Sequence, residues 1–159
     1  MGSTLDDETY LRRAIAVAAA ARAHGNHPFG AILVGPDGTI LLETENSVTT
    51  GRDATAHAER NLMSAASQKF DRALLARSTM YTSTEPCAMC AGSVYWTGVR
   101  RVVFGLSERG LLELTGFHPE NPTLDLPCRS VFACGQTPTE VVGPLLAEEA
   151  AAVHAGFWT

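Results

Sequence analysis

Basic residues are scarce in this chain. Lys69 is its only lysine, and no lysine or arginine follows Arg129. The same C-terminal segment keeps three glutamates, Glu140, Glu148 and Glu149, and the formal net charge is -5. Proteins that bind nucleic acid normally present a basic surface to the phosphates. The composition therefore argues against a nucleic-acid partner, most strongly for the C-terminal segment.

Long apolar runs and a basic leader are also missing. No run approaches the roughly 20 residues that a membrane-spanning helix needs. The N-terminus is acidic, whereas a secretory signal begins with basic residues. These absences predict a cytoplasmic protein with no membrane partner. In such a protein the four cysteines indicate metal ligands or free thiols rather than disulfides.

The first half of the chain predicts one helix and one hairpin. Apolar residues at helical spacing from Leu11 to Ala21 predict a helix that starts at a capping box, residues 4–7, and ends at Gly25. A strong turn signal at residues 35–38 joins the apolar run 30–34 to a return strand at 39–44. The chain has 159 residues, 45% of them hydrophobic, and no internal repeat. We therefore expect a single domain over residues 1–159.

The second half alternates helices and strands. Helices are predicted at residues 56–68 and 88–96, and strands at 78–83 and 101–104, an order that favours parallel pairing with helices on both sheet faces. A short helix at 108–114 and a long proline-rich loop at 115–138 follow. Expected beyond these are a short strand at 129–133, a last core strand at 139–142, and a closing helix at 144–154 with Pro144 in its first turn. The fold class is α/β.

Two short motifs carry candidate chemistry. In Pro86-Cys87-Ala88-Met89-Cys90 the cysteines are three residues apart, so on a helix they share one face. Pro86 favours a helix start there, and the positive end of a helix lowers the pKa of a thiol. Two thiolates can therefore meet one metal ion at this helix start.

The second motif is His57-Ala58-Glu59. Residues two apart point to nearly opposite sides of a helix, so both side chains can approach one metal only if it lies beyond the helix start. This places the site between two helix N-termini at the carboxyl edge of the sheet. His57, Cys87 and Cys90 are then the predicted zinc ligands. They leave one position of a tetrahedral zinc for water, and Glu59 is free to carry protons.

A structural zinc site is the alternative interpretation of the same motifs. Cys128 or Cys134 could supply a fourth ligand and close the metal to water. The protein would then be a non-catalytic zinc-binding interaction module.

With these residues in place, the chain resembles the cytidine deaminase superfamily from about residue 14 to residue 104. The matching blocks are Pro28-Phe29-Gly30-Ala31, Asn46, Thr55-Ala56-His57-Ala58-Glu59 and residues 84–92. The resemblance implies a three-layer α/β/α fold around a mixed five-stranded sheet. It also implies a zinc cofactor, hydrolytic loss of ammonia from an amino-substituted heterocycle, and a homodimer.

Within the superfamily, three branches compete: guanine deaminases, fungal-type cytosine deaminases and tRNA adenosine deaminases. Tyr95-Trp96 and Gly116-Phe117 look like guanine deaminases, but His118-Pro119-Glu120 stands where those enzymes usually carry aspartates. Substrate contacts are expected from the family-type amide and from neighbouring or lid residues: Asn46, Phe29, Ala58, Glu120, Phe157 and Trp158. Asn46 could instead be a turn residue, and Phe29 could be plain core.

The sequence thus predicts a zinc-dependent deaminase of free nucleobases or similar small heterocycles, of guanine, cytosine, isoguanine or triazine type. A tRNA adenosine deaminase is the second hypothesis, because the motif block fits it equally well. The scarcity of basic residues counts against it. Residues 117–127, or the tail with Phe157 and Trp158, are predicted to cover the pocket.

Overall fold

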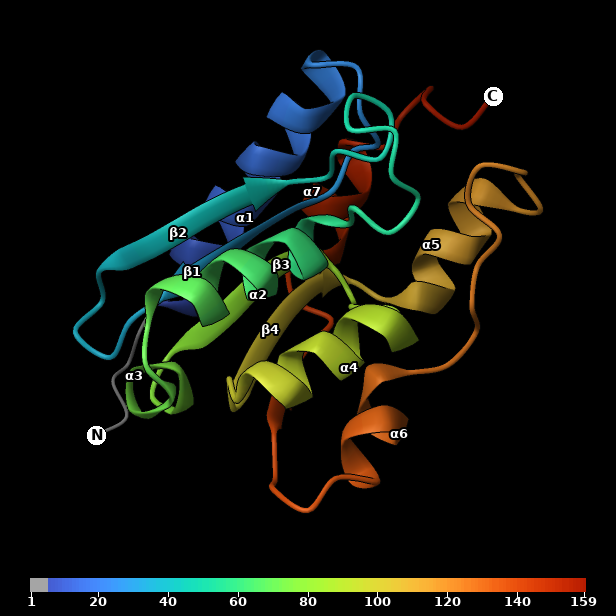
Figure 1. The fold of residues 1–159 in the computed structure, drawn as a ribbon. Helices are drawn as coiled ribbons and strands as arrows, with labels where there is room; N and C mark the ends of the chain where they lie inside the picture. The colour runs from blue at the N-terminus through green and yellow to red at the C-terminus, as the bar shows by residue number, and fades with distance from the viewer. Residues whose placement is uncertain (1–5) are drawn as a thin grey trace.

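A computed structural model describes residues 6–159 (Figure 1). In chain order the elements are α1 (Asp7–Ala23), β1 (Gly30–Val34), β2 (Ile40–Glu45), α2 (Ala58–Lys69), α3 (Arg72–Ala76), β3 (Thr79–Thr84), α4 (Ala88–Thr97), β4 (Arg101–Leu106), α5 (Glu108–Thr115), α6 (Cys128–Ala133), β5 (Glu140–Val142) and α7 (Ala147–Ala152). The strands form one five-stranded sheet in the order β2-β1-β3-β4-β5. β1 pairs antiparallel with β2 and β3, whereas β4 pairs parallel with β3 and β5. The predicted mixed sheet is confirmed.

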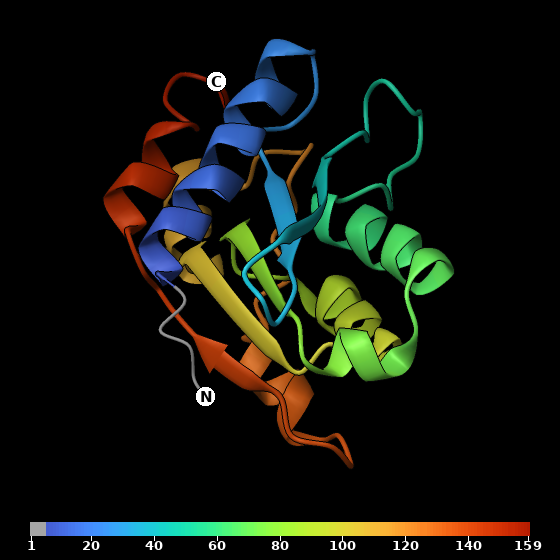
Figure 2. The same ribbon diagram turned by 90° about the vertical axis from the view of Figure 1, so that its left-hand side faces the viewer.

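Helices cover both faces of this sheet (Figure 2). On one face α1 and α7 pack against Ile32, Val34 and Val103. On the other face α2, α3, α4 and α6 pack against Ala31 and Leu33 and their neighbours. Side chains that alternate along a strand point to opposite faces, so the apolar run of β1 supplies both cores. The three-layer α/β/α arrangement is therefore confirmed.

A close approach fixes α1 on the sheet. A Cβ at Gly30 would collide with backbone atoms of Ala14, Val17 and Ala18 in α1. Only glycine lets the helix lie this near the strand. The start of β1, and with it the loop that precedes it, is thereby held against α1.

The structure differs from the predicted elements in three places. The short helix α3 at residues 72–76 was not predicted. Residues 129–133 belong to the helix α6 rather than a strand, because the spacing of Cys128 and Phe132 places both on one buried face. The closing helix is shorter than predicted. Leu146 has a left-handed backbone, with φ of 54°, and therefore keeps Pro144 outside α7.

The start of the first helix also differs in its detail. Asp6 is the N-cap of α1, and its carboxylate accepts from the Thr9 backbone N–H. The predicted capping box begins at Thr4, which lies outside the described residues. Across residues 6–159, no helix is both long and apolar enough to cross a membrane.

Candidate active site

Two helix starts meet at the carboxyl edge of the parallel strands. His57 is the N-cap of α2, Cys87 is the N-cap of α4, and Cys90 lies in the first turn of α4. His57 Nδ1 lies 3.6 Å from Cys87 Sγ and 3.5 Å from Cys90 Sγ. The arrangement predicted from the two motifs, with its centre beyond both helix ends, is present.

The spacing of these atoms fits zinc. Zinc binds cysteine sulfur at about 2.3 Å and histidine nitrogen at about 2.0–2.1 Å, so two such atoms on tetrahedral zinc are about 3.6 Å apart. Within residues 6–159, His57, Cys87 and Cys90 are the grouped residues whose ligand atoms lie within 4.8 Å of one another. Cys128 and Cys134 do not join the group, and this counts against a closed four-ligand site.

The protonation of the group suits metal binding. A hydrogen bond with the Cys90 thiol, followed by one with His57, lowers the pKa of Cys87 to about 4. The same bond to Cys87 raises the pKa of His57. Cys87 is therefore a thiolate at neutral pH, the form that binds metals.

Glu59 lies beside this group in the first turn of α2. It lines the same pocket and is only 6% exposed. Burial raises the pKa of its carboxyl to about 7, although the nearby His57 lowers it. A carboxyl with a pKa near neutrality can both accept and return a proton.

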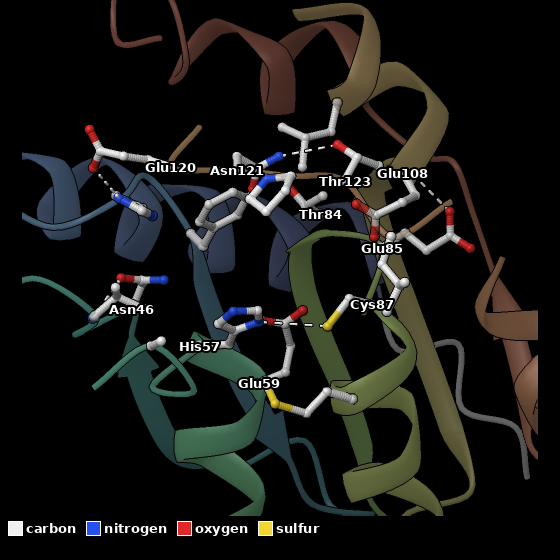
Figure 3. Close-up of a pocket in the computed structure, with 18 of the residues that line it drawn as sticks. Asn46, His57, Glu59, Thr84, Glu85, Cys87, Glu108, Glu120, Asn121 and Thr123 are labelled. Atoms are coloured by element: carbon white, nitrogen blue, oxygen red, sulfur yellow. Dashed lines mark hydrogen bonds and ion pairs between the residues drawn. The ribbon is translucent and has the colours of Figure 1, made fainter. Parts of the chain in front are cut away.

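A cavity of about 490 Å³ opens over these residues (Figure 3). This volume lies in the range of small-molecule sites. Its walls come from five regions: the loop before β1, the loop after β2, the strand ends with the starts of α2 and α4, the first half of α5, and the proline-rich segment. Residues that line the cavity include His27, Phe29, Asn46, His57, Glu59, Thr84, Glu85, Cys87, Glu108 and all of 119–124.

Asn46 lines the pocket and is also a turn residue. Its Oδ1 accepts from the Val48 backbone N–H at 3.0 Å, and its side chain is almost fully buried. The amide nitrogen faces the pocket (Figure 3). Because Oδ1 already accepts a hydrogen bond from Val48, Asn46 offers a ligand mainly the two N–H donors of its side-chain amide. Both interpretations from the sequence apply to this one side chain.

The other predicted substrate contacts occupy three different positions. Phe29 lines the pocket. Ala58 is fully buried in the core beneath it and is not part of the lining. Phe157 and Trp158 form a second layer: Trp158 packs edge-on against His27, and its indole N–H donates to His154 Nδ1 at 3.0 Å. The tail thus supports the wall of its own pocket from behind.

Residues 119–124, within the predicted lid 117–127, form part of the pocket wall; we call them the roof. Glu120 extends from the roof and is mostly exposed, and its Oε1 lies 3.2 Å from His27 Nε2. His27 lies in the loop before β1, where it is buried and lines the pocket. Its place next to Pro28-Phe29 was the one available signal.

Glu85 connects the roof to residues 85–87, the loop before α4 that carries Cys87 and that we call the metal-binding loop. Its carboxylate accepts from the Glu108 backbone N–H at 2.9 Å and from the Cys128 backbone N–H at 2.8 Å. These donors are the first residues of α5 and α6, the two helices that flank the roof. A carboxylate at helix N-termini also interacts favourably with both helix dipoles. The sequence reasoning missed this residue, although it directly precedes Pro86.

Replacing Glu85 by alanine is expected to lower the free energy of unfolding by about 2–4 kcal/mol, because two buried N–H groups lose their acceptor. Urea unfolding measures the loss, and hydrogen exchange should locate it in residues 108–128. Glu85→Gln keeps one acceptor oxygen, so its free energy of unfolding should lie between those of the unaltered protein and Glu85→Ala. An unchanged urea midpoint for Glu85→Ala would contradict the role of the carboxylate.

The fold and the site together define a zinc-binding deaminase. The chain belongs to the family described as the cytidine and deoxycytidylate deaminase zinc-binding region, which matches residues 4–106. It is therefore a deaminase, an enzyme that hydrolyses a carbon–nitrogen bond to remove an amino group, and zinc is the cofactor of its family.

Several relatives resemble the chain at different lengths. A protein of Schizosaccharomyces pombe described as a probable cytosine deaminase is 43% identical, over 96% of this chain and 92% of its own length. The guanine deaminase of Bacillus subtilis is 40% identical, over 63% of this chain and 64% of its own. The tRNA-specific adenosine deaminase of Haemophilus influenzae is 37% identical, over 64% of this chain and 59% of its own.

Solved structures share the fold over most of the chain. A complex with 2,6-diaminopurine matches with a TM-score of 0.78 and 30% identity, covering 96% of this chain and 81% of the other. The guanine deaminase of Nitrosomonas europaea matches with a TM-score of 0.76 and 28% identity, covering 96% and 83%. These likenesses support nucleobase deamination.

Proposed function

We propose that residues 1–159 act as one domain that deaminates a free nucleobase or a similar small heterocycle. The observation that carries the proposal is the pocket itself: a cavity of about 490 Å³ that joins the His57, Cys87 and Cys90 group to Glu59 under the roof. The Schizosaccharomyces pombe relative matches 96% of the chain, whereas the tRNA-specific deaminases from Haemophilus influenzae and Bacillus subtilis match 64% and 62%. The similarity to this relative therefore extends through the roof.

The side chains of the pocket have distinct roles in this proposal. His57, Cys87 and Cys90 hold the zinc, which supplies an activated water when bound. Glu59 is placed to accept a proton on its carboxyl group and to return it to the departing amine. Asn46 donates to an acceptor atom of the ring, and Phe29 packs against the ring face. The supporting walls keep bulk water out of the cavity.

An ammonia-release screen tests the function. Purified protein with zinc is offered guanine, cytosine, isoguanine and aminotriazines, together with their nucleosides where these exist and with unmodified tRNA. Release from a free base and none from tRNA supports the proposal. Release from tRNA alone, with binding that weakens steeply with salt, would establish the editing enzyme instead. No release from any compound, with three sulfurs or more around the zinc by X-ray absorption, would indicate a structural site.

We also propose a homodimer in the cytoplasm. Two apolar side chains are exposed on α4: Met89 at 37% and Trp96 at 76%. Exposed apolar side chains on one element commonly mark an interaction surface. Light scattering at micromolar concentration should give twice the chain mass, and Trp96→Glu should shift it towards the monomer. A monomeric mass for the unaltered protein would refute the assembly.

Deleting residues 156–159 is expected to raise KM roughly 2- to 10-fold, the equivalent of one lost aromatic pair, and to leave kcat nearly unchanged. The reason is that Phe157 and Trp158 contact the pocket wall and not the zinc group. Arg22 holds this tail by donating to the Val153 and Ala155 carbonyls. Deleting Thr159 alone is the control. Unchanged kinetics in the longer deletion would exclude a supporting role for the tail.

A further inference from the structure

One buried carboxyl in the pocket has no partner. Glu108 is 6% exposed and lines the cavity, and its side chain points into it (Figure 3). The backbone N–H of Glu108 donates a hydrogen bond to the Glu85 carboxylate. Its own carboxyl oxygens make no hydrogen bond or ion pair with the described residues.

The other carboxyls of the pocket are differently placed. Glu85 is occupied by two backbone donors, and Glu120 is mostly exposed and lies against His27. Glu59 belongs to the catalytic group. Glu108 is therefore the buried pocket carboxyl that is left for a ligand.

A second polar atom nearby is also unsatisfied. Thr84 Oγ1 is buried without a hydrogen-bond partner, and Thr84 lines the same cavity. Thr84 pairs with Leu106 in the parallel β3–β4 ladder, and the Glu85 backbone N–H donates to the Leu106 carbonyl. Thr84 and Glu108 therefore lie at the adjoining carboxyl ends of neighbouring strands.

Unpaired buried polar groups are costly and rare in native proteins. Thr84 Oγ1 is such a group, and the partnerless carboxyl oxygens of Glu108 open onto the same cavity, so a ligand bound there would complete hydrogen bonds on this wall. A carboxyl accepts in either protonation state, and a hydroxyl can accept as well. This wall therefore suits a donor, whereas Asn46 presents donors to an acceptor. The two polar regions are complementary in what they can bind.

We propose that Glu108 and Thr84 form a second hydrogen-bonding subsite, which binds an exocyclic amino group of the substrate other than the amine that is lost. The proposal rests on the proposed nucleobase deamination and narrows its substrate class. The preferred substrates are rings with a second exocyclic amino group, such as diamino-substituted heterocycles. Rings with a single amino group leave the subsite unpaired and bind more weakly.

The test compares ligands that differ by one amine. Ammonia release and equilibrium dialysis are measured for 2,6-diaminopurine, 2-aminopurine and adenine with the unaltered protein and with Glu108→Leu, Glu108→Gln and Thr84→Val. The unaltered protein should favour the diamino ring by about 10-fold or more, as expected for a hydrogen bond to a charged or buried group. Glu108→Leu should remove this preference through KM and the dissociation constant, with zinc content unchanged. Glu108→Gln should restore part of it, and Thr84→Val should weaken it.

Glu113→Gln is the matched control, because Glu113 is an exposed carboxylate on the same helix. An absent preference in the unaltered protein, or equal weakening of all three ligands in Glu108→Leu, would overturn the subsite. If Glu108→Leu does not fold, Glu108→Gln and Thr84→Val decide the same comparison. If no ring releases ammonia, the proposed function fails, but the dialysis ratios still test the subsite.

Discussion

Glu59→Gln is expected to keep one zinc per chain and to lose about 10²–10⁴-fold in kcat, the usual contribution of a positioned acid or base. Glutamine fills the same space in the first turn of α2 but cannot take up or return a proton. Burial already raises the pKa of Glu59 to about 7, so the native carboxyl is suited to both steps. Ammonia release under substrate saturation and metal analysis of the same sample provide the measurement.

A control variant and two contrary outcomes test the role of Glu59. Glu113→Gln, an exposed carboxylate changed in the same way, should retain full activity. Activity of Glu59→Gln within threefold of the unaltered protein would remove Glu59 from the reaction. Loss of zinc in Glu59→Gln would instead make it a structural neighbour of the metal.

The second large effect is expected for Cys87→Ala. Removing one of three protein ligands should lower zinc well below one atom per chain after dialysis. Ammonia release should fall by more than the roughly 10–100-fold that is typical of a lost supporting contact. Zinc bound at about 1,000 times its dissociation constant stabilises the folded state by about 4 kcal/mol, so the melting temperature should fall as well.

Cys134→Ser is the control for Cys87→Ala. Cys134 is exposed and lies outside the His57, Cys87 and Cys90 group, so its replacement should change neither zinc nor activity. A chelator should reproduce the effect of Cys87→Ala on the unaltered protein. Full zinc occupancy in Cys87→Ala would show that other residues bind the metal.

The elements with strong periodicity were predictable. Apolar runs, helix-start residues and the turn at 35–38 are local signals, and they predicted the hairpin, α2, α4 and the parallel strands. The spacing of His57 and Glu59 even placed the metal group beyond a helix end. The α6 helix was missed because its six residues are too short to show a period. Its helical form depends on the burial of Cys128 and Phe132 against α4.

The walls of the pocket were less predictable than the metal group. His27, Glu85 and Glu108 acquire their surroundings from contacts across 93, 43 and 23 residues of sequence. No short motif records such a contact. Asn46 was identifiable because it stands where the resembling family carries an amide, while its local turn bond to Val48 accounts for the alternative interpretation. Long-range packing therefore decides which polar residues line the substrate cavity.

The two hydrogen bonds that the Glu85 carboxylate accepts have a consequence for the evolution of this enzyme. Both flanks of residues 116–127 are fastened to one point, so the intervening chain is a loop with fixed ends. A compact loop of this kind tolerates changes in sequence and length at small entropic cost. The loop could be exchanged between homologues to redirect substrate choice while the metal-binding loop stays unaltered. Substrate choice could then evolve in residues 116–127 while the residues that bind the metal stay the same.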